Sequence, residues 1–297
     1  MEKNANIPIY NICNLLDTNN NFQDCVVYRL EDYISNRPNI VSTPHRHAFY
    51  QILFVSKGKG IHSIDFEKFS IEEKCLFFLN ASQVHKWEFE PGTEGFLINF
   101  NDNFLRTFLV NPNYLNQFSF FSGNAQYSKF SCEKCYETLH QRFEKMLYVS
   151  MDESPLKKDY VKVLMLELFL ETQLFLVTKV FDNEAHHETN NAQFIIRNFE
   201  ALLEQNYKTM RLPGAYADLL NITSNHLNTL CKKVLGLTSG EVIRNRVILE
   251  CKRLLVNADV SVLEIAYALE FKNSAYLSRF FKKYTGVTPE EFRKQAK

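Results

Sequence analysis

The sequence predicts an α+β protein with a small β-barrel or sandwich in its N-terminal part and an all-α C-terminal part. Short apolar runs separated by turn-like stretches fill residues 40 to 100, which is typical of strands. After about residue 130 long helical stretches replace them, and the last hundred residues repeat themselves at an offset of 50 positions. At roughly 100 to 200 residues per domain, the 297 residues indicate two domains.

Composition predicts a folded chain whose charge is unevenly divided. Hydrophobic residues make up 45%, and only 9 Gly and 8 Pro are present, which excludes a disordered or collagen-like protein. The formal net charge is zero, yet residues 191–297 hold 16 Lys+Arg against 10 Asp+Glu, and residues 1–190 hold 18 against 24. A basic C-terminal part favours contact with a polyanion such as nucleic acid in that part alone.

Cysteine usage and hydropathy predict a cytoplasmic protein without membrane contact. The seven cysteines are odd in number and scattered, and the opening MEKNANIPIY has no basic-then-apolar signal pattern. The most apolar stretch, residues 161–181, is interrupted by Lys162, Glu167, Glu171 and Lys179. It is therefore expected to be a buried helix rather than a membrane span.

The N-terminal domain is predicted to consist of strands followed by two helices. The clearest strands are residues 49–55, 76–79 and 96–100, with turn-like stretches at 56–60 and 90–92. Helical stretches follow over 132–148 and 155–181, whereas 182–191 has no apolar periodicity. The expected domains are residues 1–181 and 193–297, joined by a linker over 182–192.

The C-terminal domain contains an internal duplication of one helical unit. Matching residues lie 50 positions apart in the two copies. The pairs are Leu227 with Leu277, Lys232 and Lys233 with Lys282 and Lys283, Gly236 with Gly286, Leu237 with Val287, Thr238 with Thr288, and Glu241 with Glu291.

Each copy has the signals of a short helix, a tight turn and a second helix. In the second copy a capping box at Ser261 and Glu264 begins the short helix, and Gly286 ends the second helix. In the first copy Thr223 caps the second helix and Gly236 ends it. A further capping box at 238–241 begins a helix of about 18 residues, roughly 27 Å long at 1.5 Å per residue, which would hold the two copies apart.

Two helices across a tight turn form a helix-turn-helix, whose second helix can lie in the major groove of DNA. Successive grooves on one face of B-DNA lie about 34 Å apart, so a spacer of this length would let one chain read two of them. The alternative is a structural helical repeat with a solvated polar face. Asn can pair with adenine and Arg with guanine, while lysines neutralise phosphates. The residues predicted to contact DNA are Ser224, Asn225, Asn228, Thr229, Lys232, Lys233, Ser274, Ala275, Ser278, Arg279, Lys282 and Lys283.

Several stretches of the second copy carry a family signature. They are SVLEIA at 261–266, Phe271, SAYLSRFFKK at 274–283 and GVTP at 286–289. They resemble the DNA-binding signature of the AraC/XylS transcription regulators, and the resemblance covers about the last hundred residues. It implies double-stranded DNA and RNA polymerase as partners, and transcriptional control that is usually activation. Glu270 departs from the signature, which commonly has glycine there, and a left-handed backbone would be strained with a glutamate.

A second, weaker pattern lies in the N-terminal domain. HRH at 45–47, Gln51, Gly58 and HKW at 85–87 resemble the cupin sensor barrel often found ahead of such DNA-binding units. Strand alternation places these histidines on one face of their strands, and side chains on the lumen side of a small barrel either fill it or line a ligand site. The residues predicted to bind a small-molecule effector are His45, His47, Gln51, His85 and Trp87.

We expect no metal and no cofactor in this barrel. Three histidines plus a carboxylate would suit iron, manganese or zinc, but Gln51 stands where metal cupins place a glutamate. A neutral amide is a poor replacement for an anionic ligand. Two alternatives to an effector-controlled regulator stay open: a metal-dependent cupin enzyme with a DNA-binding tail, and a regulator with a filled barrel controlled by a protein partner.

The remaining motifs are less specific. The chain has no P-loop, dinucleotide glycine fingerprint, GxSxG or HExxH, so we predict that it is not an enzyme. Cys132 and Cys135 have CxxC spacing, but no second pair completes a structural zinc site. The helix over 155–181 is apolar around much of its circumference and must be covered. Packing on the barrel is one reading, and the seam of a homodimer, as in relatives with this sensor, is the other.

Overall fold

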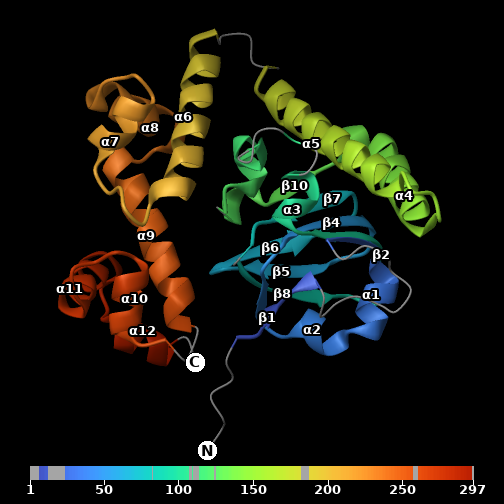
Figure 1. Cartoon of the computed structure of the whole chain (residues 1–297), viewed down its shortest axis with the longest axis horizontal. Coiled ribbons are helices and arrows are strands. Elements are labelled where there is room, and N and C mark those ends of the chain that lie inside the picture. Colours follow the sequence, from blue (N-terminus) through green and yellow to red (C-terminus); the bar gives the residue numbers. More distant parts are fainter. Residues whose placement is uncertain are drawn as a thin grey trace, which may run out of the picture. The chain divides into compact units, whose positions relative to one another are not determined.

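The computed structural model of the chain contains two compact units, one of Pro8–Asn183 and one that includes Glu184–Lys297 (Figure 1). The first unit is rich in strands and the second is helical. This order confirms the predicted α+β class with a barrel-like N-terminal domain and an all-α C-terminal domain. The structure describes residues 7–12, 24–81, 83–106, 109, 114–123, 125–181, 187–256 and 260–295.

Two five-stranded sheets form the first unit. Their strands pair antiparallel, except that β1 runs parallel to β3. One sheet has the order β1 (Ile9–Tyr10), β3 (His45–His47), β8 (Val84–Phe89), β5 (Gly60–Ile64), β6 (Glu67–Ile71). The other has the order β10 (Lys129–Ser131), β7 (Cys75–Leu79), β4 (Tyr50–Lys57), β9 (Glu94–Phe100), β2 (Cys25–Arg29).

Strand β4 is buried on both of its faces. Leu53 and Val55 belong to a core cluster that also holds Trp87, which lies on β8 of the other sheet. Ile52 and Phe54 belong to a second cluster, built with the helices that follow the barrel. Because successive side chains of a strand point to opposite sides, the odd-numbered residues of β4 line the lumen and the even-numbered ones face the helices.

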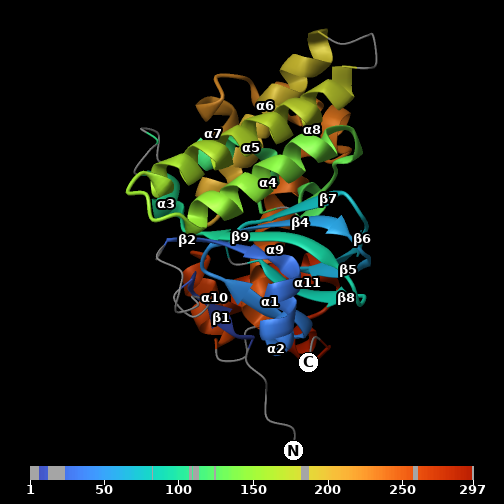
Figure 2. The ribbon, with the colours of Figure 1, turned by 90° about the vertical axis from the view of Figure 1, so that its right-hand side faces the viewer.

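Helices α4 (Tyr136–Met151) and α5 (Lys157–Phe181) cover the outer face of the β10-β7-β4-β9-β2 sheet (Figure 2). The rings of Phe54 on β4 and Phe143 on α4 stack with centroids 4.8 Å apart. No helix in the part of the chain that the structure describes is long and apolar enough to cross a membrane. The shorter helical segments of this unit are α1 (Leu30–Asn36), α2 (Pro38–Ser42), α3 (Asp102–Arg106), η2 (Tyr114–Gln117), η3 (Ser119–Phe121), η4 (Ala125–Tyr127) and η5 (Glu133–Cys135).

The second unit is all-helical and encloses a single core cluster. Its first helix begins at His187, so the second half of the expected linker is helical, and residues 182–186 lie outside the described residues. The helices are α6 (His187–Asn206), α7 (Pro213–Leu219), α8 (Ser224–Leu235), α9 (Ser239–Val256), α10 (Val262–Ala268), α11 (Ser274–Thr285) and α12 (Pro289–Gln295).

The predicted helix signals are confirmed. Ser261 and Glu264 make a reciprocal capping box at the start of α10. Residues 238–241 do the same at α9, where the Glu241 carboxylate accepts from the Thr238 amide at 2.7 Å. Gly236 ends α8 at φ 70° and Gly286 ends α11 at φ 82°, a left-handed conformation that favours glycine.

Candidate functional site

Both helix-turn-helix turns have the same backbone geometry. Asn221 lies at φ 54° and Glu270 at φ 52°, both in the left-handed region. In the second helix-turn-helix unit the Phe271 amide donates to the Ala266 carbonyl at 2.8 Å. The first helix-turn-helix unit makes the equivalent bond at 3.0 Å. Asparagine adopts this region at little cost and glutamate at a larger cost, so the turn of the second helix-turn-helix unit carries local strain at Glu270.

The second helix of each unit, the recognition helix, buries one face in the shared core. On α8 the buried side chains are Leu227, Leu230 and Cys231, and on α11 they are Leu277 and Phe281. Thr223 and Asn273 cap the two helices, since each side chain accepts from the amide three residues later. With these caps and one buried face, the opposite face of each helix is directed to solvent.

The predicted DNA contacts on α8 divide into two groups. Asn228 is half-buried, and its Oδ1 accepts from the Ser239 amide at 3.2 Å, at the first residue of α9. This side chain is therefore engaged in joining α8 to α9. The exposed members are Ser224, Asn225, Thr229, Lys232 and Lys233, of which Thr229 donates its hydroxyl to the Asn225 carbonyl at 2.9 Å.

On α11 the exposed members are Ala275, Arg279, Lys282 and Lys283, while Ser274 and Ser278 are half-buried. Arg279 makes no ion pair with any residue that the structure describes. Its guanidinium can therefore reach a base edge without first giving up a carboxylate partner. The Lys283 ammonium lies 5.3 Å from the centre of the Tyr284 ring.

Two exposed side chains on the recognition helices escaped the sequence prediction. His226 is exposed on α8, and Tyr276, its counterpart 50 residues later, is 52% exposed on α11. His226 lies three residues before Thr229 and seven before Lys233, so it shares their face. Both residues lie at helical spacing from the predicted contacts, so this spacing could have identified them in the sequence.

Helix α9 is held within the helical domain by contacts with neighbouring helices. Arg246 donates to Glu204 of α6 at 3.0 Å and to Glu250 at 3.0 Å. Burial opposes its charge, but the two carboxylates outweigh burial and raise the pKa of Arg246. Near the C-terminal end of α9, the Arg293 guanidinium of α12 donates to the Leu255 carbonyl at 3.2 Å. These contacts fix α9, which lies in the chain between the two helix-turn-helix units, to α6 and α12.

A direct contact also joins the segment before α7 to the turn of the second helix-turn-helix unit. Arg211 donates to the Leu269 carbonyl, and its guanidinium lies 3.7 Å from the centre of the Phe271 ring. Partial burial lowers the pKa of Arg211. Both contacts fall on the turn that presents α11, so Arg211 contributes to the fixed geometry of the pair.

The predicted effector residues all lie in the barrel and are buried. Their exposed fractions are 0 to 3%. Register explains why they meet: His45 lies opposite His85 across β3 and β8, and His62 lies opposite Trp87 across β5 and β8. His62, fully buried, is a fourth histidine that the prediction missed. Its strand β5 was not among the expected strands, which is why periodicity around residues 49–55 could not point to it.

The four imidazoles form one cluster. One ring nitrogen each of His45, His47 and His85 lies within 4.8 Å of the others. His62 Nε2 is 3.2 Å from His85 Nδ1, and His45 Nδ1 is 2.8 Å from the Thr43 carbonyl oxygen. The Nε2 atoms of His45, His47 and His85 are buried without a hydrogen-bond partner among the described residues.

Burial decides the protonation of this cluster. It lowers the pKa of His45 and holds the pKa of His47, His62 and His85 well below the usual histidine value, and the neighbouring imidazoles lower the last three further. The rings are therefore neutral at physiological pH, so each offers a lone pair.

Gln51 is occupied elsewhere in the lumen. Its Nε2 donates to Asn99 Oδ1 at 2.8 Å, between the adjacent strands β4 and β9. Of the predicted effector residues, His45, His47, His85 and Trp87 are thus joined by ring contacts, with centroid distances such as 4.8 Å for His85 and Trp87. Gln51 forms a separate amide pair.

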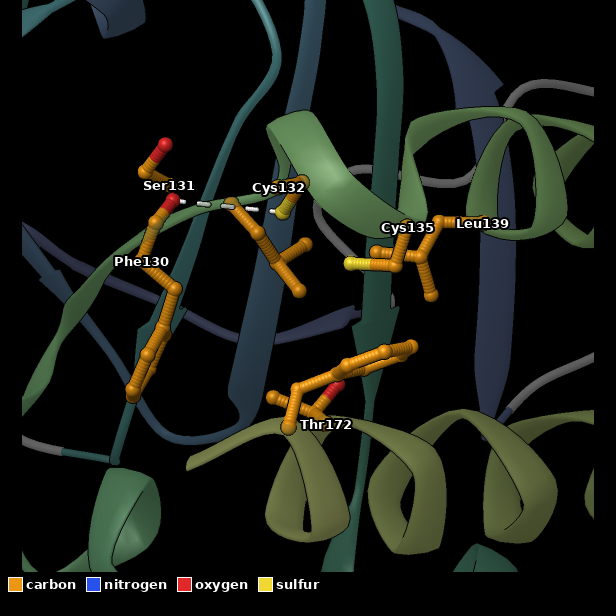
Figure 3. Close-up of a pocket in the computed structure, with 8 residues that line it drawn as sticks. Phe130, Ser131, Cys132, Cys135, Leu139 and Thr172 are labelled. Atoms are coloured by element: carbon orange, nitrogen blue, oxygen red, sulfur yellow. Dashed lines mark hydrogen bonds between the residues drawn. The ribbon is translucent and has the colours of Figure 1, made fainter. Parts of the chain in front are cut away.

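A small apolar cavity of about 30 Å³ lies between the sheet and α5 (Figure 3). Cys132 and Cys135 line it from one side and Thr172 from α5, and Cys132 Sγ is 3.9 Å from the Phe130 carbonyl oxygen. Its other lining residues are Leu76, Phe130, Ser131, Leu139 and Phe175. None of these eight lining residues is charged, and the space is about large enough for one water molecule. The CxxC pair therefore lines a small, partly open apolar pocket.

One exposed face of α5 is largely apolar and is interrupted by Glu167, which is exposed and pairs with Arg142. Its side chains follow a spacing of four and three residues, which is typical of a helix–helix seam. Met165, Leu168 and Phe169 on the opposite face pack in the barrel core, so the exposed face is additional to the packing that covers the sheet. The exposed apolar residues are Leu156, directly before α5, and Tyr160, Val163, Leu170 and Leu174 on α5.

The chain matches two known domain families. Residues 30–153 match the AraC-like ligand binding domain, and residues 216–295 match a helix-turn-helix domain. The chain is 23% identical over 267 residues to the transcriptional activator RhaS of Yersinia pestis (strain Pestoides F), covering 87% of this chain and 91% of the relative.

Two solved structures are also similar. ToxT from Vibrio cholerae has 14% identity and a TM-score of 0.40, covering 91% of this chain and 97% of that one. The C-terminal domain of the response regulator yesN from Fusobacterium nucleatum has 23% identity and a TM-score of 0.31, covering 35% of this chain and 99% of that one.

Fold and site together define a DNA-binding transcription regulator that carries a ligand-binding barrel ahead of a double helix-turn-helix domain. The chain belongs to the AraC/XylS family of transcription regulators. Both predictions from the sequence, the family and the general function, are confirmed. Regulators of this family are generally not enzymes.

Proposed function

We propose that this protein is a cytoplasmic transcriptional activator that reads two successive major grooves of DNA, works with RNA polymerase and catalyses no reaction. The observation that supports it is the duplication. Two helix-turn-helix units with the same turn, cap and C-terminal glycine flank one 18-residue helix, α9. At roughly 27 Å this helix approaches the groove repeat of about 34 Å.

The exposed polar residues of α8 and α11 are the proposed DNA contacts. Arg279 and Asn225 are the proposed base readers, since Arg pairs with guanine and Asn with adenine. His226 and Tyr276 join them because they share the same helix faces. The lysines 232, 233, 282 and 283 supply phosphate contacts. Asn228 is better explained as the residue that fixes α9 to α8.

Spacing between half-sites tests the proposal most directly. DNA selected from a random library by the full chain should contain two half-sites about 10 base pairs apart, protected on one face of the duplex. Inserting five base pairs between them rotates one half-site to the far side, where the rigid α9 cannot follow. Affinity should then fall to that of a single half-site, whereas changing the central base pairs at constant length should have little effect. Equal affinity for both spacings would contradict the proposal.

The barrel is the proposed sensor. A ligand held among His45, His47, Gln51, His85 and Trp87 would control the regulator by binding one arrangement of the DNA-binding domains better than another. Trp87 is the only tryptophan of the chain and is fully buried in this lumen. Its fluorescence should therefore change when the effector enters. A ligand that alters DNA binding without altering Trp87 fluorescence would place the sensor elsewhere.

We further propose that the protein is a homodimer joined through α5. The exposed stripe of Leu156, Tyr160, Val163, Leu170 and Leu174 has the spacing of a two-helix seam and would pair with the same stripe of a second copy. Sedimentation velocity of the full chain should show a dimer that Leu170→Glu converts to monomer. Phe66→Glu changes an exposed apolar residue on the β5–β6 hairpin and serves as the control, which should remain a dimer. A dimer that survives Leu170→Glu would exclude this seam.

A further inference from the structure

Cys132 and Cys135 lie at the two ends of one tight turn beside the apolar pocket. Cys132 directly precedes η5 and Cys135 ends it, and the Cys135 amide donates to the Cys132 carbonyl at 2.9 Å. A hydrogen bond of this kind closes a turn in which the outer Cα atoms are less than about 7 Å apart. Disulfides need a Cα separation of about 4.4 to 6.8 Å, so the backbone brings these two cysteines within reach of each other.

The two side chains also share one space. Both line the pocket between the sheet and α5, and both are reduced thiols in this structure. Figure 3 shows the Cys135 sulfur directed toward the side of the pocket on which Cys132 lies. The hydrogen bond from Cys132 Sγ to the Phe130 carbonyl oxygen is 3.9 Å long, and a thiol is a weak donor. The pocket thus holds a pair of thiols whose separation along the backbone suits a bond between them.

The other described cysteines of the strand-rich domain lie out of reach of this pair. Cys75 lies opposite Ser131 across β7 and β10, but its side chain belongs to the lumen cluster on the other side of the sheet. Cys25 lies on β2, which is four strands away from β10 in the same sheet. Adjacent strands are about 4.8 Å apart, so Cys25 lies about 19 Å from β10. Among the described cysteines of this domain, Cys132 and Cys135 are therefore the pair that can form a disulfide.

The pocket restricts which oxidant can reach the pair. Its volume of about 30 Å³ is enough for about one water molecule, and its lining is apolar and uncharged. Cys132 is 2% exposed and Cys135 is 9% exposed, so a reagent must enter the pocket to reach either sulfur. Hydrogen peroxide is small and neutral, whereas oxidised glutathione is a large, charged peptide disulfide. The pocket therefore favours peroxide.

We propose that Cys132 and Cys135 are a modification site that hydrogen peroxide converts to a disulfide. Cys135 reacts first, since it is the more exposed thiol and directly precedes α4, whose amino end stabilises negative charge. Its sulfur bonds to one peroxide oxygen, the O–O bond breaks, and the other oxygen leaves as water with the thiol proton, which gives a sulfenic acid. The Cys132 sulfur then bonds to the Cys135 sulfur, and the remaining oxygen leaves as water with the Cys132 proton. The two thiols lose two electrons, and one peroxide is reduced to two waters.

The disulfide would change the wall against which α5 packs. Thr172 and Phe175 of α5 line the same pocket as the two thiols. An S–S bond of about 2.05 Å is much shorter than a contact between two separate thiols, so the sulfur atoms must move relative to α5. Leu170 and Leu174 of the proposed dimer seam lie on the same turns of this helix. We therefore expect oxidation to weaken the dimer, a consequence that rests on the proposed seam.

Peptide mapping of the full-length, reduced chain after treatment with hydrogen peroxide tests the site. Remaining thiols are alkylated before digestion. Trypsin cleaves between the two cysteines, after Lys134, so a disulfide leaves peptides 130–134 and 135–142 joined until a reductant separates them. Met151 is 71% exposed, and its sulfoxide reports the peroxide dose. The joined peptides should appear by the dose at which Met151 is fully oxidised. Two alkylated thiols in these peptides at that dose would overturn the proposal.

Single variants assign the two roles, and each should unfold cooperatively. Cys132→Ala should stop the reaction at the Cys135 sulfenic acid, which dimedone traps, whereas Cys135→Ala should leave Cys132 as a thiol. Cys75→Ala removes a thiol on the lumen side of the sheet and is the control, which should form the joined peptides as the parent does. Oxidised glutathione should react at least about 10-fold more slowly than peroxide, because access to buried thiols limits the rate. Equal rates would contradict the pocket as the route to the thiols.

The effect on assembly has its own measurement. In sedimentation velocity the oxidised chain should have a dimer dissociation constant at least about 5-fold higher than the reduced chain, the lower end of usual coupling, and a reductant should reverse the change. Cys135→Ala should show no change after peroxide treatment. A disulfide that forms without changing the dissociation constant would overturn the link to α5. Failure of the seam itself is distinguishable, because Leu170→Glu would then leave the reduced dimer intact while the peptide map still shows the disulfide.

Discussion

The two helix-turn-helix units have the same backbone and different side chains. Both place a residue at φ 52–54° in the turn, both cap the recognition helix with a side-chain oxygen, and both end it with a left-handed glycine. At matching positions, however, the first unit has Cys231 where the second has Phe281, and it has Thr229 where the second has Arg279. Backbone signals thus specify the module, while single positions set how firmly it is packed and what it contacts.

The largest expected difference concerns the buried faces. Phe281→Ala should lower the free energy of unfolding of the helical domain by about 3–5 kcal/mol, because it leaves a large cavity in the core that the two helix-turn-helix units share. Cys231→Ala, at the matching position, removes one sulfur atom and should cost about 1 kcal/mol. Urea unfolding followed by far-ultraviolet circular dichroism measures both. Equal costs would mean that the two units are packed alike.

The exposed faces should differ in sequence discrimination. Arg279→Ala should lower discrimination at one base pair by about 1–3 kcal/mol, the value of a bidentate contact with guanine. Thr229→Ala should change it less, because the Thr229 hydroxyl already donates to the Asn225 carbonyl. Fluorescence anisotropy with every single-base variant of the selected site provides the comparison. A uniform loss on all sequences would show that Arg279 contacts phosphate instead.

The turns should differ in strain. Glu270→Gly should stabilise the protein by about 0.5–1 kcal/mol, since glycine adopts the left-handed conformation freely but loses more backbone entropy on folding. Asn221→Gly should be nearly neutral, because asparagine already tolerates this conformation. Thermal unfolding of the two variants and the parent decides the point. A destabilised Glu270→Gly would indicate that the glutamate side chain makes a compensating contact.

The smallest expected effect is electrostatic and equal in both units. Lys232→Ala and Lys282→Ala should each reduce the slope of log K against log salt by about 1, and each should weaken all DNA sequences alike. Lys158→Ala removes the same charge from α5, which belongs to the strand-rich domain, and is the control, with an unchanged slope. A larger effect for one of the two lysines would show that its unit carries more of the phosphate contact.

Local patterns allowed most of the fold to be predicted. The capping boxes at 238–241 and 261–264, the terminal glycines and the 18-residue helix up to Val256 all occur as expected. These features depend on residues at most four positions apart, whose hydrogen bonds form within one turn of helix. The alternation of His45, His47 and Gln51 along the chain likewise predicted that they are buried in the barrel.

The site was less accessible to prediction, because its details depend on distant partners. Asn228 is of a residue type that can read a base, but its side-chain oxygen accepts a hydrogen bond from the backbone amide at the start of α9. His62 had no motif of its own and entered the cluster through the pairing of β5 with β8. Gln51 was compared with a metal ligand, although its amide is paired with Asn99, 48 positions away in the chain.

By itself, then, the sequence determined the two-domain order, the duplicated helix-turn-helix module and the polar faces of its recognition helices, since helix periodicity and end caps are short-range properties. Only the tertiary structure decided which polar atoms are free. Sheet register placed four histidines from three strands around one point and left the Nε2 atoms of His45, His47 and His85 without a hydrogen-bond partner among the described residues. Such an arrangement depends on contacts between segments far apart in the chain, for which local composition carries no signal.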